Sequence, residues 1–283
     1  MLRYWFPNSE VALATEGETD ENTQRPSFDK YPAWLSSELR VKPDLEKNRY
    51  ERESVGIVRA AQRSPLWLAY QRSKAELADR YLASTTYPLF VESGPEEVLR
   101  KPWSSFLHKT YRHNVSRNEN WPNEPPEGWL APNNWFQDVH DIARTTIVVK
   151  YLDGVATVTK AFDEMARQET MDDFRCEFEA RETGYYAAHM RAGVDFPLLD
   201  TEWSESRVHG QFEVQVTTQL QEVIRRLTHR EYENRRSRDQ EPELKWQWDY
   251  GSDSFTPNYL GHILHYMEGM IMEVRERGKG NHV

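Results

Sequence analysis

The stretch that decides the fold is HGQFEVQVTTQ, residues 209–219. Apolar residues from Phe212 to Val216 alternate with polar ones, so that Glu213 and Gln215 face away from them. This alternation is typical of a strand with one buried face and one open face. An acid beside an amide makes the polar side either a solvated surface or the floor of a site.

Composition limits the class of protein. The chain has 283 residues, a net charge of −10 and a single cysteine, Cys176, which excludes an internal disulfide and a cysteine-based zinc site. The negative charge argues against a general nucleic-acid binder but allows a local basic patch. The N-terminus MLRYWFPNSE does not resemble a signal peptide, and no run approaches the roughly 20 apolar residues of a membrane span. We expect a cytoplasmic protein with no membrane partner.

Periodicity predicts a mixed α/β fold in which helices flank one central mixed sheet. Helical patterns cover 52–83 (two helices, broken at Pro65), 95–113, 155–168, 220–238 and the tail from Tyr259 to Val274. Strand patterns cover 143–152, 174–181, 184–196 and 209–219. Residues 8–33 are interpreted as a loop or arm, and 114–136 as a Trp- and Pro-rich loop that packs. We expect an N-terminal extension (1–92), a catalytic domain (93–238) and a helical tail (239–283).

The segment KPWSSFLHK carries Lys101, Ser105 and Lys109 at intervals of four residues. On a helix these side chains share one face. Two ammonium groups and a hydroxyl suit a polyphosphate, because each supplies hydrogen-bond donors to phosphate oxygens. The alternative is a solvated helix face.

Two further segments add candidate site residues. Asp141 precedes the strand expected at 143–152, where it would hold Mg²⁺ or cap a turn. In RETGYYAAH, Gly184 permits an unusual backbone conformation and Tyr185 is able to stack on a base. Arg181 and His189 are able to contact phosphate. The alternatives are core packing for Tyr185 and a buried structural histidine for His189.

The order Lys-x-x-x-Ser-x-x-x-Lys, Asp, Arg-x-x-Gly-Tyr-x-x-x-His and Glu-x-Gln-x-x-Thr resembles the synthetase domain of the RelA/SpoT family, over residues 95–235. Members of that family transfer pyrophosphate from ATP to a ribose 3′-hydroxyl. The Trp/Pro-rich loop, the run VVKYLDGV and the tail FTPNYLGHILHYMEGMIMEVRER are similar to the toxic small alarmone synthetases of toxin–antitoxin and phage-defence systems. The resemblance implies a nucleotidyltransferase-like fold.

The resemblance also implies a role for each motif residue. On the donor side, ATP would be bound by Lys101, Ser105, Lys109, Arg144 and Arg181. Mg²⁺ would be held by Asp141 and Glu213, and Glu213 would help to deprotonate the 3′-hydroxyl. His189 would lie beside the transferring group, Tyr185 would stack on the acceptor base, and Gln215 would position the acceptor.

The chain departs from the family pattern at Thr146, Tyr186 and Thr217, where relatives carry cations or other polar residues. The cations expected to hold the 5′ phosphates of a nucleotide acceptor are therefore missing. This favours an acceptor without those phosphates, such as the 3′-CCA end of tRNA, whose modification inhibits translation. The alternatives are a small alarmone synthetase making (p)ppApp or (p)ppGpp, and an inactive nucleotide-sensing or partner-binding module.

Partners follow from the same interpretation. Six arginines on helix 220–238 offer a stripe for tRNA phosphates, although glutamates on this helix also fit a balanced, solvated face. The resemblance implies a cognate antitoxin protein, with the terminal extensions as candidate surfaces. The apolar face of the tail helix is expected to pack on the core.

Overall fold

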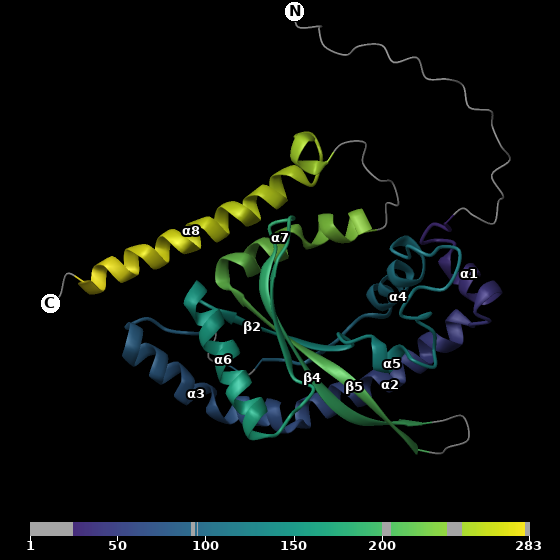
Figure 1. Cartoon of the computed structure of the whole chain (residues 1–283), viewed down its shortest axis with the longest axis horizontal. Helices are drawn as coiled ribbons and strands as arrows, with labels where there is room; N and C mark the ends of the chain where they lie inside the picture. The colour runs from purple at the N-terminus through teal and green to yellow at the C-terminus, as the bar shows by residue number, and fades with distance from the viewer. Residues whose placement is uncertain (1–24, 92–93, 95, 200–204, 237–244, 281–283) are drawn as a thin grey trace, which may run out of the picture.

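The protein is described here by a computed structural model covering residues 25–91, 94, 96–199, 205–236 and 245–280 (Figure 1). Within these residues, no helix combines the length and the apolarity needed to cross a membrane. The tryptophan-rich loop packs as the sequence predicts, because Trp121 and Trp129 both lie against Trp34, with ring centroids 5.6 and 5.4 Å away.

One five-stranded sheet forms the centre of the fold, in the order β1-β2-β5-β4-β3. β2 and β5 are parallel and the other neighbouring pairs are antiparallel. The strands are β1 (Leu99–Arg100), β2 (Ala143–Val149), β3 (Arg175–Ala180), β4 (Tyr186–Leu199) and β5 (Glu205–Thr218). The mixed α/β fold predicted from the sequence is confirmed.

Helices cover the apolar face of this sheet. Phe212, Val214 and Val216 of β5 are buried, and Trp67 packs edge-on against Phe212 at 5.8 Å. The covering helices are α2 (Pro43–Arg63), α3 (Pro65–Thr85) and α6 (Leu152–Gln168), seen below and to the left of the sheet in Figure 1. The other helical elements are α1 (Tyr31–Glu38), α4 (Trp103–Tyr111), η2 (Arg112–Ser116), α5 (Trp135–Asp138), α7 (Gln219–Arg236), η3 (Trp246–Trp248) and α8 (Phe255–Gly280).

The break between α2 and α3 lies at Pro65, as predicted. Pro65 has no amide hydrogen and therefore fits the first turn of a helix. Ser64 caps α3 by accepting a hydrogen bond from the Trp67 amide at 3.3 Å. Both helices extend beyond the predicted 52–83.

The helix predicted over 95–113 is wrong in its first half. Residues 99–100 form β1, and α4 begins only at Trp103. Lys101 precedes a proline, which disfavours the helical conformation, and its amide donates to the carbonyl of Ile142 at 2.8 Å. Lys101 therefore lies at the edge of the sheet and does not share a helical face with Lys109.

The prediction that the tail helix packs its apolar face on the core is also wrong. The buried side of α8 is polar and includes Asn258, Glu268 and Arg275. Its exposed side carries the apolar residues Tyr259, Ile263, Tyr266, Met267, Met270, Ile271 and Val274. Helical spacing identified the two faces, but spacing alone does not show which face packs on the rest of the protein. Here the polar face does, because its side chains make the buried contacts.

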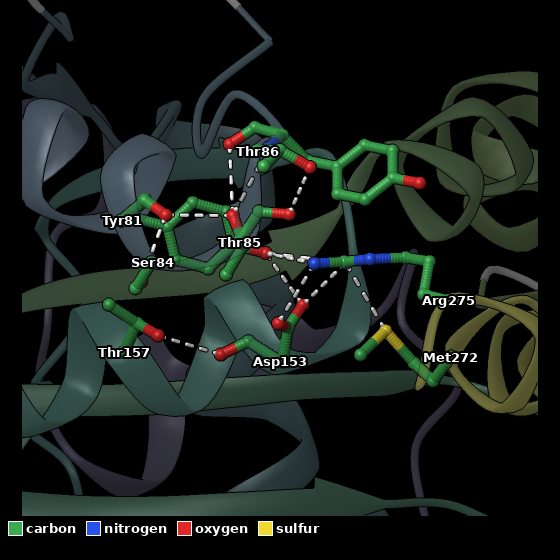
Figure 2. A network of polar contacts seen from close by, with 9 residues as sticks. Tyr81, Ser84, Thr85, Thr86, Asp153, Thr157, Met272 and Arg275 are labelled. Carbon is green, nitrogen blue, oxygen red and sulfur yellow. Dashed lines mark hydrogen bonds and ion pairs between the residues drawn. The ribbon is translucent and has the colours of Figure 1, made fainter. Parts of the chain in front are cut away.

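Arg275 anchors the C-terminal half of α8 (Figure 2). Its guanidinium donates to the Asp153 carboxylate at 3.1 Å, and the Tyr81 hydroxyl donates to the same carboxylate at 2.7 Å. The guanidinium also lies 4.4 Å from the ring centroids of both Tyr87 and Tyr151. A buried cation with both an anion and aromatic partners fixes this half of the helix to α3 and α6.

Glu268 makes the docking of α8 depend on pH. It is 4% exposed, and burial raises its pKa to about 7 from an ordinary 4.5. His265 Nδ1 lies 3.4 Å from Glu268 Oε2. The pKa of His265 is lowered, chiefly by burial and then by the charge of His262. The folded protein thus keeps the Glu268 proton between pH 4.5 and 7 while the unfolded chain releases it, so stability is full below this window and falls as pH rises through it.

We therefore expect Glu268→Gln to stabilise the protein at pH 8 by about 2 kcal/mol and to flatten the dependence of stability on pH between 5 and 8. Urea unfolding at both pH values measures this. Glu273→Gln, on the exposed side of the same helix, is the matched control and should behave as the wild type does. An unchanged slope in Glu268→Gln would contradict the assignment.

Candidate functional site

Charged and polar side chains gather on the sheet face opposite the apolar one. Strand register aligns Glu213 of β5 with Arg144 of β2 on one side and Arg191 of β4 on the other. The next aligned pair on this face is Gln215 and His189. Since aligned residues on neighbouring strands project to the same side of a sheet, β5 supplies the middle of a continuous polar surface.

Two lysines converge on one carboxylate at the edge of this surface. Lys101 Nζ lies 2.6 Å from Asp141 Oδ2, and Lys109 Nζ lies 2.8 Å from Asp141 Oδ1. Lys101 is buried, whereas the Lys109 side chain is 32% exposed. Lys109 reaches Asp141 from α4 and Lys101 from the strand edge. The structure thus brings the two predicted lysines and the predicted acid together, although not by the helical spacing used to select them.

The charges in this cluster are set by burial and by each other. Burial opposes ionisation of Asp141, but Lys109 and Lys101 outweigh it and hold the pKa of this carboxyl well below its ordinary value. Burial also lowers the pKa of Lys101, against the attraction of Asp141. The cluster is thus one carboxylate held between two lysine side chains.

A hydrogen-bonded chain leads into the buried acid on β5. The Tyr185 hydroxyl lies 2.9 Å from His189 Nε2, and His189 Nδ1 lies 3.3 Å from Glu213 Oε2. A carboxylate accepts only, so Nδ1 carries the ring proton and Nε2 accepts from Tyr185. Gln215 Nε2 donates to the other oxygen, Glu213 Oε1, at 2.6 Å. Four predicted site residues are therefore in contact.

Glu213 is ionised at neutral pH. Burial alone would raise its pKa, but the contacts with His189 and Gln215 hold the pKa below its ordinary value. The negative charge of Asp141 acts on Glu213 in the opposite direction. The lysine–aspartate cluster and the β5 acid are thus near enough to influence each other electrostatically.

Arg181 and Tyr185 lie at the turn between β3 and β4. The Arg181 guanidinium is 5.2 Å from the Tyr185 ring centroid and 2.5 Å from Glu179 Oε2. Burial, followed by the charges of Glu179 and Glu213, raises the pKa of Tyr185, so its hydroxyl stays protonated and able to donate. Gly184 within the turn has φ +75°, as its unusual backbone was predicted to require.

Ser105 and Arg144 are the remaining predicted ATP-binding residues near the two lysines. Ser105 lies on α4, half-buried, one turn before Lys109. Arg144, also half-buried, is close enough to Lys101 for its charge to lower the pKa of that lysine, after burial and the opposing effect of Asp141. Both therefore lie beside the lysine–aspartate cluster.

Sequence reasoning missed two residues of this surface. Glu179 bridges towards His189, with Oε2 3.7 Å from Nε2, and Arg191 is the cross-strand neighbour of Glu213. The alternation in FRCEFEAR already places Glu179 on the polar side of its strand. The alternation in YYAAHMRA places Arg191 on the same side of its strand as His189. The missing information was the register that sets β3, β4 and β5 against one another.

A basic pocket of about 370 Å³ adjoins the cluster at Lys109. Arg112 and His113 of η2 and Arg117, directly after η2, line it. The following loop, which includes two acids, contributes Asn118, Glu119, Pro125, Pro126 and Glu127 to the lining. η2 is a π-helical turn, a rare conformation that is frequent at functional sites. The pocket extends the positive surface outward from Lys109.

The carboxylates fit a hard cation. Asp141 and Glu213 supply the oxygen ligands that Mg²⁺ prefers, and Mg²⁺ is usually held by one or two carboxylates together with substrate phosphates. Over the described part of the chain, no group of three or more His, Cys, Asp or Glu is arranged to hold a metal ion by itself. The two acids would therefore share Mg²⁺ with phosphate oxygens.

The arginine stripe predicted on α7 is described only in part. Arg225 and Arg226 both donate to Glu222, at 2.6 and 2.7 Å. Arg230, Arg235, Arg236 and Arg238 lie outside the residues whose side chains the structure describes. The stripe as a whole therefore stays a prediction.

No family model and no curated protein matches the sequence. Among solved structures, the chain is similar to small alarmone synthetase 1 from Bacillus subtilis bound to its product pppGpp, with 15% identity, 76% of this chain and 95% of that chain covered, and a TM-score of 0.46. It is also similar to a GTP pyrophosphokinase family protein from Streptococcus pneumoniae, with 15% identity, coverage of 77% and 92%, and a TM-score of 0.45. At this sequence identity and these TM-scores, function has to be argued from the residues of the site.

Proposed function

We propose that this protein is a pyrophosphokinase that transfers pyrophosphate from ATP to a ribose 3′-hydroxyl, with the 3′-CCA end of tRNA as the acceptor. The observation that carries the proposal is the joint placement of a Lys101–Asp141–Lys109 cluster and a buried, ionised Glu213. The first binds phosphates and the second accepts a proton. The order of the sequence motifs, which resembles RelA/SpoT synthetases, supports the same reaction.

On the donor side, the two ammonium groups bind the ATP phosphates. Each ammonium has three hydrogen-bond donors and uses one on Asp141, which leaves donors for phosphate oxygens. Arg144 and Ser105 lie beside the cluster and add a charge and a hydroxyl. Phosphoryl-type transfer needs mainly positioning and charge neutralisation, and these groups supply both.

On the acceptor side, the 3′-oxygen attacks the β-phosphorus of ATP. The new bond joins the 3′-oxygen to that phosphorus, the bond from the β-phosphorus to the oxygen of the α-phosphate breaks, and AMP leaves. Glu213 accepts the hydroxyl proton, while His189 and Gln215 hold its carboxylate in place. Bound by Asp141 and Glu213, Mg²⁺ would neutralise phosphate charge and lower the pKa of the hydroxyl.

The tRNA acceptor is supported by two features. Thr146 and Thr217 stand where cations for the 5′ phosphates of a nucleotide would be expected. The pocket that Arg112, His113 and Arg117 help to line offers contacts to phosphates beyond those of the reacting nucleotide, which a polynucleotide has and a free nucleotide lacks. Capping the terminal ribose with pyrophosphate would block aminoacylation and thereby translation.

A translation-blocking enzyme would act as a toxin and would need restraint by a cognate antitoxin protein. This part of the proposal rests on the resemblance of the loop and tail segments to toxic small alarmone synthetases. Co-expression identifies such a partner by restoring growth that the protein alone inhibits. Growth that is unaffected by the protein, when transfer is measured in vitro, would contradict the toxin role.

The experiment that tests the proposal is labelling with γ-³²P-ATP and Mg²⁺ in parallel incubations with deacylated tRNA, GDP, GTP, AMP and ADP. We expect label on tRNA, followed by gel electrophoresis, and none on the nucleotides, followed by thin-layer chromatography. Label on a free nucleotide alone would identify an alarmone synthetase, and absence of any transfer would favour an inactive sensing or binding module.

A further inference from the structure

We propose that α8 is a positioning element of the acceptor site, which holds the turn 181–186 in the conformation that presents Tyr185 and Arg181. The inference rests on the proposed function, since it assigns Tyr185 to the acceptor side. It goes further in making the C-terminal helix, outside the motif-bearing region, part of the site.

The contact between α8 and the turn is made by two glycines. A Cβ added to Gly184 would lie 2.3 Å from the carbonyl oxygen of Asn258, and a Cβ added to Gly261 would lie 2.3 Å from the carbonyl oxygen of Gly184. Such distances are far inside van der Waals contact and involve backbone atoms, which have little freedom to move aside. Both positions therefore require glycine for the helix to approach the turn this closely.

Side chains of α8 hold the same turn from either side. His262 Nε2 lies 2.8 Å from the carbonyl oxygen of Glu182, and His262 Nδ1 lies 2.9 Å from the Tyr186 hydroxyl. The carbonyl requires Nε2 to donate, so Nδ1 accepts from Tyr186. The His265 ring stacks on the Tyr186 ring at 3.7 Å and 7°. Tyr186 is thereby engaged by α8, which leaves Tyr185 on the side of His189.

Short hydrogen bonds and side-chain contacts connect the turn to the site. The Arg181 amide donates to the carbonyl of Tyr185, and the Gly184 amide donates to the carbonyl of Arg181, both at 2.9 Å. Tyr185 in turn contacts His189, which contacts Glu213. A displacement of Gly184 by α8 therefore moves Arg181 and Tyr185 relative to the buried acid.

The helix is also fixed at the contact itself and in its C-terminal half, so that a clash at Gly261 has little chance of being relieved by the helix moving. Gln221 of α7 donates to the carbonyl of Gly261 at 3.2 Å, and Arg275 is held by Asp153 and Tyr81. An added methyl group at Gly261 should consequently displace the turn.

The test compares Gly261→Ala with Gly269→Ala. Gly269 lies on the same helix, and a Cβ there would meet nothing within 4 Å. Alanine favours helix over glycine at both positions, so a selective loss in Gly261→Ala would not come from helix propensity. We expect Gly261→Ala to raise the KM for the acceptor at least tenfold and the KM for ATP by less, since Arg181 is the one donor-side group in the turn, and Gly269→Ala to behave as the wild type does.

A second variant and a second readout keep the inference testable. His265→Ala removes the stack on Tyr186 without a clash and should raise the KM for the acceptor severalfold, while thermal unfolding checks that each variant is folded. Amide hydrogen exchange at 182–186 should be faster in Gly261→Ala than in Gly269→Ala. Equal acceptor KM and equal exchange in the two glycine variants would overturn the inference. If the wild type transfers to no acceptor, the proposed function fails, and the exchange measurement still tests the positioning of the turn.

Discussion

Replacing Glu213 by Gln is expected to lower the rate of transfer about 10³-fold, the size of effect typical of losing a general base. The amide keeps the shape of the side chain and an oxygen that accepts from His189, but it accepts no proton and binds a cation poorly. The measurement is the single-turnover rate of label transfer from γ-³²P-ATP. Because the lost groups are the proton acceptor and a cation ligand, binding of ATP measured separately without Mg²⁺ should change little.

Glu177→Gln is the matched control for Glu213→Gln. Glu177 is on β3, aligned with His189, and therefore lies on the same face of the sheet as Glu213. Its side chain is 61% exposed, and it lies 3.7 Å from the guanidinium of Arg191. The same chemical change there should leave the rate within about twofold of the wild type. Retention of more than a tenth of the rate in Glu213→Gln would exclude Glu213 as the base.

Asp141→Asn is expected to have the largest effect on stability, because it leaves the buried Lys101 and the half-buried Lys109 facing each other without an anion. Breaking a buried pair by removing one partner costs about 3–5 kcal/mol, and the partial exposure of Lys109 places the expected value at about 3 kcal/mol. Urea unfolding at pH 7 measures it. Transfer should also be lost, since the phosphate-binding lysines lose the group that places them.

Asp141→Asn has a matched control at an exposed ion pair, and it should also change how stability depends on pH. Asp163→Asn removes an exposed pair with Arg167 and should cost less than about 1 kcal/mol. The pKa of Asp141 is lowered by folding, so its contribution is present above the ordinary aspartate value of 3.8 and is lost as pH falls below it. Asp141→Asn should therefore reduce the loss of stability on acidification. A variant as stable as the wild type at pH 7 would contradict the buried charge cluster.

The sequence predicted the part of the site that depends on alternation. The period of two in 209–219 placed Glu213 and Gln215 together on an open face, and the β-branched run at 143–152 predicted the strand that forms β2. In the structure these two residues are in contact on the polar face. Arg181, Gly184 and Tyr185 were likewise grouped by spacing, and the positive φ of Gly184 matches its predicted role.

The parts that escaped prediction depend on tertiary contacts. Lys101 was assigned to a helix because its spacing to Lys109 is four residues, whereas Pro102 and the bond to Ile142 keep it at the sheet edge. Glu179 needed the register of β3 against β4. The orientation of α8 was predicted wrongly because the buried partners of Arg275 come from α3 and α6, and periodicity on one helix contains no information about them.

The most direct test of the central claim uses two tRNA substrates that differ only in the terminal adenosine. One lacks the 3′-hydroxyl and the other lacks the 2′-hydroxyl. With γ-³²P-ATP and Mg²⁺, we predict label on the 2′-deoxy tRNA and none on the 3′-deoxy tRNA, and no label on either with Glu213→Gln. Equal labelling of both substrates, or label on free nucleotides only, would contradict transfer of pyrophosphate to the 3′ end of tRNA.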